Sequence, residues 1–313
     1  MALWRKNTAR ASLSLVSDGL RYLALDGTTG HFKLTQAKAV TTPHPFLQQG
    51  MLPDANRAVP LLEKLRQEMD GSFLKVPVSI SLPARDVMLR VVDMPRMGAE
   101  EARDALQWDF DKYFPFPAGE AVYDVCPLEV PGGEDAEKMK VLVAAARLRM
   151  VETVMDIVVK GGFSVGGAEP ILVGIFRSLL GPMPSFKSGA LLVLPEKQST
   201  QIMVAYRSSG LLFRTLLVGF GAGGDREEMV RTIGREAGST AAFVRNQFRE
   251  LSVDTVLLGG EFSREPGLDE EIRSIMPDVA VQAVAMWDQW GISNPPSGGE
   301  WEGALGLLVG GEP

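Results

Sequence analysis

The sequence predicts an α/β protein with two lobes of similar internal order and a separate αβ subdomain inserted into the first lobe. Three observations favour this architecture. Short strand-like runs open the chain, a second group of such runs begins near residue 190, and an unusual strand–helix–strand–strand block lies between them. Hydrophobic alternation and helical spacing identify the elements of each part. Two halves that open in the same way suggest an internal duplication, although they share little sequence identity.

Composition limits the kinds of function that the chain can have. It has 313 residues, 45% hydrophobic and 23% charged, as expected for a globular protein with a sizeable core. The formal net charge of -7 argues against a general nucleic-acid binder, because neutralising phosphates requires a basic surface. A single cysteine, Cys126, excludes an internal disulfide and any multi-cysteine metal site. The only histidines, His31 and His44, give little basis for a metal centre or a Cys–His catalytic pair.

The sequence also bears on location. No run approaches the roughly 20 apolar residues that a membrane span requires. The first residues carry charge but lack the apolar core of a signal peptide. A single cysteine suits a reducing cytoplasm. We therefore expect a cytoplasmic protein that reaches a membrane only through partners.

The first lobe is expected to open with an antiparallel meander. Turn sequences at 17–19 and 26–28 separate its strands. The predicted elements, in order, are strands over 11–16, 20–26 and 31–39, an amphipathic helix over 58–69 and a buried strand over 76–82.

The inserted block is expected to contain one long helix. Glu100 and Glu101 lie in its first turn, where negative charge is favourable. Gly161-Gly162 is a natural end for the helix that returns to the lobe. The predicted elements are strand 87–92, helix 100–114, strands 122–129 and 139–145, helix 150–160, a crossing at 166–170 and helix 171–180.

The second lobe repeats the opening meander and then becomes richer in helix. Its predicted elements are strands 190–194, 201–206 and 211–218, helices 226–237 and 240–251, strand 256–259, helix 268–275, strand 279–281 and helix 301–309. The order of three strands, helix and strand that opens the chain is how each half of an actin-like fold begins.

Several short motifs follow one another in a distinctive order. They are a strand ending in Met94-Pro95, an acidic helix, the aromatic-proline run Phe114-Pro-Phe-Pro117, a strand over 140–147 and the pair Glu169-Pro170. This order resembles that of PilM-like proteins of type IV pilus assembly, which are relatives of the cell-division protein FtsA. Near the end of the chain, residues 256–260 with 266–268 resemble the adenosine-side motif of the family, and 303–307 resemble its closing helix.

The resemblance implies an actin-like fold with lobes over 1–180 and 181–313, the first containing the subdomain at about 84–148. It also implies a cytoplasmic scaffold, peripheral at the inner membrane, that docks the N-terminal peptide of a PilN-type membrane protein. A PilO-type protein and the pilus assembly motor ATPase are further partners that the family implies, and a homodimer is left open. A platform protein of type II secretion is a close variant of this hypothesis.

The two hairpins that hold phosphate in actin-like ATPases depart from the family pattern. Each is expected to carry an Asp and a Gly, but alignment places Ser14 and Val16 in the first hairpin and Leu194 and Glu196 in the second. Val16 disfavours positive φ and brings a side chain to where backbone N–H groups should approach phosphate. A charged Glu196 at ~4 Å from the γ-phosphate repels it by about 4 kcal/mol at an effective dielectric of roughly 20, and Lys197 offsets part of this repulsion.

These losses predict a protein that does not hydrolyse ATP efficiently and requires no cofactor. Binding of ATP or ADP with Mg²⁺ is left open, because glycines on the adenosine side are retained. The residues expected to contact a nucleotide are Ser17, Asp18, Ser199, Thr200, Gly259 and Gly260. The alternative is an active actin-like ATPase or small-molecule kinase, for which Asp18 is the only acid near the first phosphate turn.

The predicted helix 100–114 carries one aromatic residue away from its apolar face. Trp108 lies nearly opposite the stripe that contains Leu106 and Phe110, and such tryptophans are enriched in interfaces. Trp108 is therefore the first candidate for partner binding, with packing against the neighbouring lobe as an equal alternative. The other candidates for the same groove are Arg85, Arg90, Tyr113, Phe114 and Phe116, although the two phenylalanines are better explained as local core.

Residues 219–224 formally fit the dinucleotide-binding pattern G-x-G-x-x-G. Such a site requires a parallel βαβ unit and an acidic residue about 20 positions later. Here the preceding strand belongs to a meander, and residues 243–246 near that distance read Phe-Val-Arg-Asn. We therefore expect a flexible connection into a helix, close to where actin-like relatives approach the nucleotide.

Overall fold

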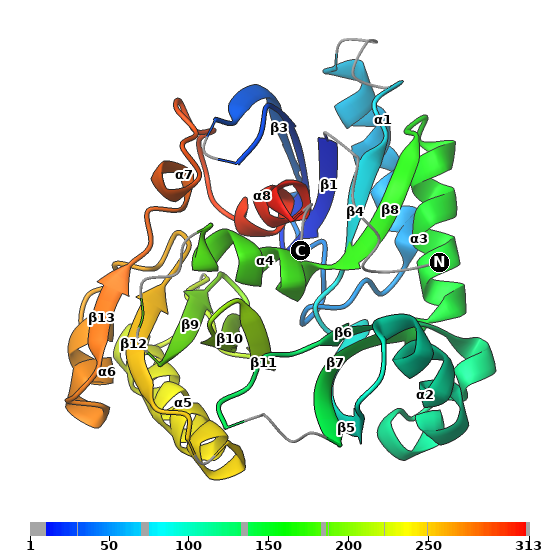
Figure 1. Cartoon of the computed structure of the whole chain (residues 1–313). Helices are drawn as coiled ribbons and strands as arrows, with labels where there is room; N and C mark the ends of the chain where they lie inside the picture. The colour runs from blue at the N-terminus through cyan, green and yellow to red at the C-terminus, as the bar shows by residue number, and fades with distance from the viewer. Residues whose placement is uncertain are drawn as a thin grey trace.

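The computed structural model describes residues 11–29, 31–69, 75–132, 137–182, 186, 188–221, 223–248 and 250–310. In this part of the chain, two sheets have five strands each and a third has three. Figure 1 shows the two larger sheets in an upper and a lower lobe, with helices between them. The smaller sheet lies beside the lower lobe and packs against α2.

The first large sheet has the strand order β3-β2-β1-β4-β8. β1 pairs antiparallel with β2 and parallel with β4, so the opening meander continues into parallel strands. The predicted strands of this lobe are confirmed, with boundaries shifted by at most two residues. Its strands are β1 Ala11–Val16, β2 Gly19–Asp26, β3 Lys33–Thr41, β4 Val78–Leu82 and β8 Val165–Pro170.

The second large sheet repeats this arrangement in the order β11-β10-β9-β12-β13. Its first strand also pairs antiparallel with the second and parallel with the fourth. Equivalent pairing of the strands supports the internal duplication that the sequence suggests. The strands are β9 Gly189–Pro195, β10 Thr200–Tyr206, β11 Ser209–Leu216, β12 Val253–Leu258 and β13 Ala280–Ala283.

The inserted subdomain is an antiparallel sheet in the order β5-β7-β6, covered on one face by α2. β5 and β6 are therefore the edge strands of this sheet. The elements are β5 Val87–Pro95, α2 Ala99–Tyr113, the short helix η3 Ala118–Glu120, β6 Ala121–Pro127 and β7 Lys138–Arg147.

Helices cover the large sheets and fill the space between them. α1 Val59–Gln67, preceded by η1 Ala55–Ala58, and α3 Leu148–Lys160 pack on the first sheet. α5 Arg226–Gln247 and α6 Leu268–Ile275 pack on the second sheet. α4 Ile171–Leu180 and α8 Glu302–Val309 lie between the lobes. Among the described helices, none has both the length and the apolar character to cross a bilayer.

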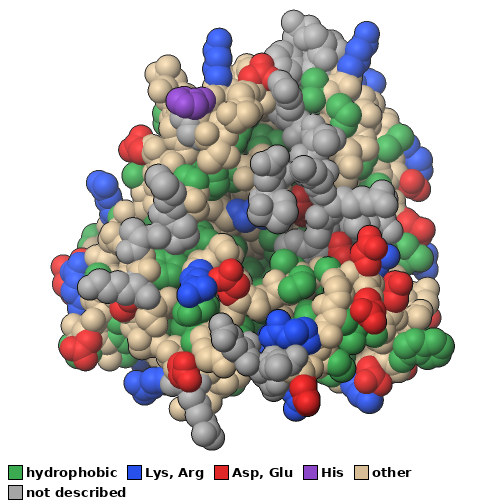
Figure 2. All heavy atoms as spheres, in the orientation of Figure 1, with side chains coloured by type: hydrophobic (Ala, Val, Ile, Leu, Met, Phe, Trp, Pro, Cys, Tyr) green, Lys and Arg blue, Asp and Glu red, His purple; other side chains and the backbone are tan. Residues whose placement is uncertain are grey.

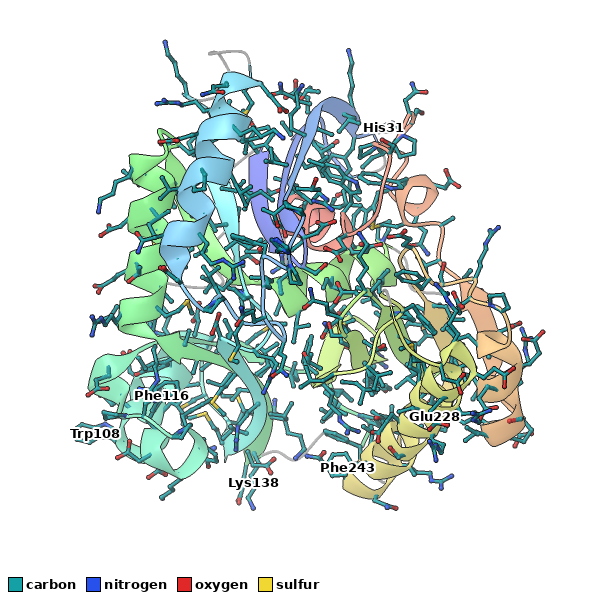
Figure 3. The ribbon with its side chains drawn as sticks, turned by 180° about the vertical axis from the view of Figure 1, so that it is seen from behind. His31, Trp108, Phe116, Lys138, Glu228 and Phe243 are labelled. Atoms are coloured by element: carbon teal, nitrogen blue, oxygen red, sulfur yellow. The ribbon has the colours of Figure 1, made fainter. Side chains whose placement is uncertain are left out.

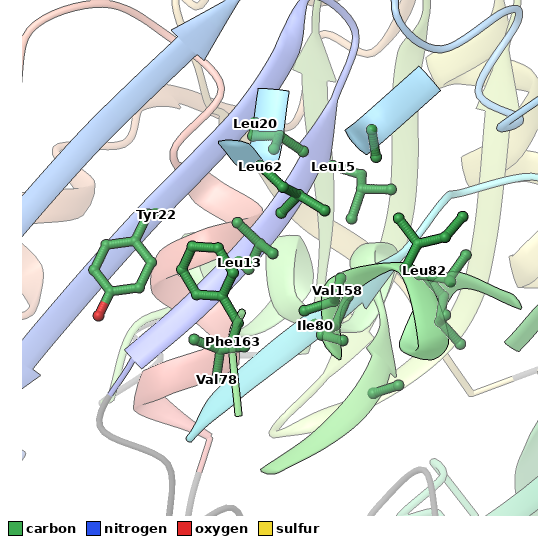
Figure 4. Close-up of a cluster of buried hydrophobic side chains, with 14 of the residues drawn as sticks. Leu13, Leu15, Leu20, Tyr22, Leu62, Val78, Ile80, Leu82, Val158 and Phe163 are labelled. Atoms are coloured by element: carbon green, nitrogen blue, oxygen red, sulfur yellow. The ribbon is translucent and has the colours of Figure 1, made fainter. Parts of the chain in front are cut away.

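The core beneath α1 and α3 holds the first hairpin of the chain in place. Leu13 and Leu15 of β1 pack there with Ile80, Leu62 and Val158, all of them buried (Figure 4). Alternate residues of a strand point to the same face, so the apolar spacing of β1 fixes which side of the strand faces this core. The end of β1, where the hairpin turns, is thereby fixed as well.

The last described segment returns to the first sheet. Trp301 packs with Leu23 in a buried cluster, and Ser12 Oγ donates a hydrogen bond to the carbonyl oxygen of Ala304 at 2.7 Å. The last strand of the first sheet ends at Pro170 and the first strand of the second begins at Gly189, whereas α8 packs on the first sheet. The short helix α7 Met286–Gln289, which the sequence analysis did not predict, belongs to the same cluster.

The prediction of two helices over 226–237 and 240–251 is wrong, because one continuous helix, α5, ends at Gln247. Gly234 and Gly238 occur inside it. A Cβ at Gly234 would lie 2.6 Å from Cγ of Glu271, and one at Gly238 would lie 2.5 Å from Cγ2 of Ile275. These glycines therefore provide the surface on which α6 packs and do not end the helix.

The expected crossing at 166–170 is also corrected, because these residues belong to β8. β8 pairs in parallel with β4, with Ala168 opposite Ile80. Its glycine-rich sequence has no apolar alternation, so the strand depends on pairing with a partner that is distant in the sequence.

α4 and α8 approach each other through glycines. A Cβ at Gly306 would lie 1.7 Å from the carbonyl oxygen of Gly174, and a Cβ at Gly174 would lie 2.9 Å from the carbonyl oxygen of Gly303. Backbone atoms cannot yield as a flexible side chain can, so this spacing requires the absence of side chains at both helices.

Replacing Gly306 by Ala is expected to lower the free energy of unfolding by about 2–3 kcal/mol, because the added methyl group forces α4 and α8 apart. Denaturant unfolding measures this change. The matched control is Gly119→Ala, where an added Cβ meets no atom within 4 Å. Its effect is expected to stay within about 0.5 kcal/mol. Equal effects of the two substitutions would contradict the close approach.

Candidate functional site

The hairpin between β1 and β2 forms one wall of the cleft between the lobes. Val16 pairs with Gly19 across a two-residue turn formed by Ser17 and Asp18. Gly19 has a φ of 149°, and a Cβ there would lie 2.1 Å from the carbonyl oxygen of Val40. Only glycine fits this position without displacing the neighbouring strand.

Val16 and Ser14, the two residues of this hairpin that depart from the family pattern, are both buried. Val16 packs among residues of α4, including Ile171. The expectation that Val16 stands in the path of a phosphate is wrong, because β1 stays extended to its end and this side chain belongs to the core. Ser14 is fully buried, and its hydroxyl donates a hydrogen bond to Ser81 Oγ at 3.1 Å.

The hairpin between β9 and β10 forms the opposite wall. The N–H of Glu196 donates to the carbonyl oxygen of Ser199 at 2.8 Å, and that of Gly221 donates to the carbonyl oxygen of Lys197 at 2.7 Å. A Cβ at Gly219 would lie 2.4 Å from the carbonyl oxygen of Glu196. The glycine-rich segment after β11 therefore packs directly onto this turn. Because β11 is an antiparallel edge strand, these glycines do not belong to a dinucleotide-binding βαβ unit.

A row of charged side chains crosses the cleft. The Asp18 carboxylate lies 3.0 Å from Lys197 Nζ and 2.8 Å from Arg21 Nη2. Burial opposes ionisation of Asp18, but Arg21 and Lys197 together hold its pKa below the ordinary value. The hydrogen bond to Asp18 is in turn the main cause that raises the pKa of Lys197. The turns of the two lobes are thus joined by an ion pair.

Three glutamates, Glu196, Glu300 and Glu302, have their carboxyl groups buried beside the same cleft. Burial, assisted by the nearby charge of Glu300, raises the pKa of Glu196 to about 8. Burial also raises the pKa of Glu302 to about 7, and it raises that of Glu300 against the opposing effect of hydrogen bonds from Ser17. Within the described residues, no group of His, Cys, Asp and Glu side chains is arranged to hold a metal ion.

The raised pKa of Glu196 corrects the expectation that a charged Glu196 repels the γ-phosphate. With a pKa of about 8, its carboxyl group is mostly protonated at neutral pH and carries little of the negative charge that was assumed. One of its oxygens accepts hydrogen bonds from Ser199 Oγ at 3.0 Å and from Gln201 Nε2 at 2.9 Å. Glu196 is therefore held within its own hairpin.

Glu300 contacts the first hairpin directly. One carboxylate oxygen accepts from the N–H of Ser17 at 3.0 Å, and the other accepts from the Ser17 hydroxyl. On the other side of the turn, Arg21 Nε donates to the carbonyl oxygen of Gly299 at 3.1 Å, and its guanidinium lies 5.8 Å from the ring centroid of Trp301. Residues 299–301 are therefore fixed to the hairpin at several points. Glu300 and Arg21 were not among the residues predicted for the site, because their two segments lie far apart in the chain.

Two open cavities flank this charged cluster. The first has a volume of about 430 Å³ and lies between the lobes. Its lining residues are Ser17, Asp18, Thr42, Pro43, His44, Pro45, Lys197, Gln198, Gly219, Gly221 and Gly223. The second has a volume of about 520 Å³ and is lined by Gly260, Glu261, the start of α7, and residues around Gly299 and Trp301.

The structure brings together only some of the six residues expected to contact a nucleotide. Ser17 and Asp18 line the first cavity, whereas Gly260 lines the second. Ser199 is buried and bonded to Glu196, and the buried Thr200 hydroxyl donates to the carbonyl oxygen of Val218 at 2.8 Å. A Cβ at Gly259 would lie 2.4 Å from Leu179, so this glycine serves packing against α4.

The inserted subdomain has an aromatic core. The ring of Phe110 stacks on that of Phe114 at a centroid distance of 4.6 Å and lies 5.9 Å from that of Phe116. Phe114 and Phe116 are both buried, and the guanidinium of Arg147 covers the ring of Phe116 at 4.9 Å. These two phenylalanines hold α2 on its sheet and leave little surface for direct contact with a partner.

The other four docking candidates differ in exposure. Trp108 is 83% exposed on the outer face of α2 (Figure 3), so the alternative that it packs against the neighbouring lobe is wrong. Arg90 is exposed on β5, and Tyr113 is half-buried at the end of α2. Arg85 Nη1 donates to the carbonyl oxygen of Gln49 at 3.2 Å, which ties it to a loop of the first lobe. Figure 2 shows acidic, basic and hydrophobic side chains interspersed over the lower part of the molecule, where the subdomain and second lobe lie.

Comparison with known proteins identifies the relationship. Residues 13–166 match the family model described as type IV pilus assembly protein PilM. The resemblance to the PilM family is confirmed. The structure is similar to a chain of the PilM–PilN type IV pilus biogenesis complex, with 21% identity, a TM-score of 0.75, and coverage of 98% of this chain and 100% of that chain. The PilM-like fold is an actin-like α/β fold of two lobes.

Two other solved structures have lower TM-scores. The cytoplasmic domain of EpsL, an inner-membrane component of the type II secretion system of Vibrio cholerae, has 13% identity and a TM-score of 0.47, with 79% of each chain covered. A Bacteroides thetaiotaomicron protein with an actin-like ATPase fold has 14% identity and a TM-score of 0.47, with 90% of this chain and 93% of that chain covered. No curated protein sequence matches the chain.

The buried Glu196 predicts a specific dependence of stability on pH. Its pKa is about 8 in the folded protein and 4.5 ordinarily, so between these values the folded state retains a proton that the unfolded chain has lost. Stability therefore falls as pH rises through this window, by at most about 1.4 kcal/mol per pH unit for this group. Glu196→Gln is expected to make the decline shallower, as measured by denaturant unfolding at several pH values.

The control for this experiment is Glu100→Gln, which changes an exposed glutamate in the first turn of α2. Its profile is expected to run parallel to that of the unsubstituted protein. Glu302, with a pKa of about 7, continues to contribute to the decline of the free energy of unfolding with pH in both variants. An unchanged slope in Glu196→Gln would contradict the assignment of a buried, protonated carboxyl group.

Proposed function

We propose that this chain is a non-catalytic, actin-like scaffold of a type IV pilus inner-membrane platform. It docks the N-terminal peptide of a PilN-type membrane protein and is thereby held at the cytoplasmic side of the membrane. The match to the PilM family model supports the pilus assignment, and the similarity to a chain of the PilM–PilN complex supports the partner. A PilO-type protein, the assembly motor and a second copy of the chain are further partners within this proposal.

The observation that carries the docking site is the exposure of Trp108. Covering so much exposed apolar area of a tryptophan contributes more to the binding free energy than covering most other side chains does. The rest of α2 follows the usual pattern, since Ala102, Leu106 and Phe110 are buried against the sheet. Trp108 is therefore an exception to the packing of this helix, and partner binding explains it.

β5 gives this surface a second component. It is an edge strand, and within the described residues its outer side has no strand partner. Arg90 lies two residues from Met88 and two from Val92, and every second residue of a strand faces the same side. Met88 and Val92 belong to the core under α2, so Arg90 lies on the same side of the sheet as α2. An extended peptide that adds to such an edge obtains affinity from main-chain hydrogen bonds and specificity from neighbouring side chains.

We further propose that the cleft does not support efficient ATP turnover. Magnesium and the attacking water require carboxylates, but the two family positions carry Ser14, bonded to Ser81, and the buried Leu194. The nearby carboxylate of Asp18 is already paired with two cations. These residues do not fit a magnesium-bound triphosphate. Repeated ATP turnover that Asp18→Asn abolishes would instead establish an active ATPase or kinase.

Trp108→Ala is expected to weaken binding of a PilN-type N-terminal peptide by about 2 kcal/mol, or roughly thirtyfold in Kd, because an interface tryptophan contributes much of the buried apolar area. Arg90→Glu is expected to weaken it as well, since the charge at the edge of the sheet is reversed. Isothermal titration calorimetry measures both changes.

Matched controls are available on other helices. Phe243→Ala removes an aromatic side chain that is 55% exposed on α5 of the second lobe, and Arg149→Glu reverses an exposed charge on α3. Neither is expected to alter the affinity for the peptide. Unchanged affinity in both Trp108→Ala and Arg90→Glu would exclude this placement of the site.

A further inference from the structure

The contact between Glu300 and the first hairpin has no part in peptide docking on α2. Backbone N–H groups at a tight turn can bind anions, and this turn is the one at which the resemblance places phosphate. Here the N–H of Ser17 donates to one carboxylate oxygen of Glu300 at 3.0 Å, and the Ser17 hydroxyl donates to the other. Both donors of Ser17 are therefore already occupied by a carboxyl group of the same protein.

We infer that Glu300 is a built-in anion that occupies the phosphate-binding turn and competes with phosphate-bearing ligands for the cleft between the lobes. The ligand class is a polyphosphate, free or as the tail of a nucleotide. Ser17 donates in both contacts and the two oxygens of Glu300 accept, so this carboxyl group, when ionised, satisfies the turn in the way that two oxygens of a phosphate group would.

The backbone around Glu300 is built to hold this carboxylate in place. Glu300 has a φ of 64°, in the left-handed region that non-glycine residues rarely adopt, and it is only 7% exposed. A Cβ at the preceding Gly299 would lie 2.6 Å from Oε2 of Glu261, so a side chain there would require Glu261 to move. Arg21 and Trp301 then fix the segment on either side of Glu300. An unfavourable conformation that is held this firmly indicates a positioned group.

Burial raises the pKa of Glu300, whereas two of the three charges that face it favour its ionised form. Arg21 and Lys197 provide two cations, while Asp18 contributes a negative charge that both of them already neutralise. The remaining acidic neighbours, Glu196 and Glu302, have pKa values raised to about 8 and 7, so a large share of these carboxyl groups is protonated and uncharged near neutral pH. Without the carboxylate of Glu300, the turn would offer two unoccupied donors beside two cations.

The consequence is a cleft whose two walls are held together without a ligand. Ser17 is bonded to Glu300, and the adjacent Asp18 is paired with Lys197 of the second lobe. A polyphosphate can enter the turn only by displacing Glu300. The device is separate from the surface on α2, so it can be tested independently of the proposed scaffold function.

The test is calorimetric titration with inorganic tripolyphosphate, without nucleotide. Glu300→Gly removes the carboxylate and places at the left-handed position the residue that favours it, so folding is expected to be retained. This variant is expected to bind tripolyphosphate at least about tenfold more tightly than the unsubstituted protein, because a like charge and a competing acceptor are both removed. Glu300→Gln retains an acceptor without the charge, and its gain is expected to be smaller. Adding Lys197→Met to Glu300→Gly is expected to abolish the gain.

Gln49→Gly is the control for the backbone change, because Gln49 also has a positive φ, of 51°, but does not line the cavity. It is expected to leave tripolyphosphate binding unchanged. Equal binding by the unsubstituted protein and by a folded Glu300→Gly variant would overturn the inference, as would a gain that Lys197→Met does not reduce. Affinity for the PilN-type peptide is expected to stay the same in Glu300→Gly, which separates this result from the fate of the scaffold proposal.

Discussion

The backbone contact between α4 and α8 determines how the two lobes are placed. α4 packs mainly against the second sheet and α8 against the first, so the separation of these helices sets the separation of the sheets. Glycines at 174 and 306 allow the two backbones to touch. Arg177 of α4 reinforces the contact, because it donates to the carbonyl oxygen of Gly306 at 3.0 Å and pairs with the buried Glu169 of β8 at 2.5 Å. The Glu169-Pro170 pair of the family motif is thus part of the joint between the lobes.

The electrostatics of the cleft follow from this placement. With the lobes held close, Asp18 and Lys197 meet across the gap, and the carboxyl groups of Glu196, Glu300 and Glu302 come near one another in a poorly hydrated space. A buried charge must be paired, hydrogen-bonded or removed by proton uptake. Asp18 is paired, Glu300 is hydrogen-bonded by Ser17, and raised pKa values favour the protonated forms of Glu196 and Glu302. The cleft therefore neutralises itself with its own side chains.

Local patterns in the sequence predicted most of the fold. The alternation in β1 and the apolar stripe of α2 depend on neighbouring residues, so their elements could be found within a few positions. The strand β8 and the unbroken helix α5 could not, because one depends on pairing with β4 and the other on packing of α6 against Gly234 and Gly238. The site shows the same division. The loss of acidic residues from the hairpins is visible in the sequence, whereas the contact of Glu300 with Ser17 joins positions that only folding brings together.

The return of the chain to its starting sheet has a consequence for biosynthesis. Ser12 in the first strand is bonded to Ala304 in the last described helix, and Leu23 is covered by residues near the same end. During translation, one face of the first sheet must remain open to water until α8 has left the ribosome. Such late closure of a long loop slows assembly and exposes apolar surface meanwhile.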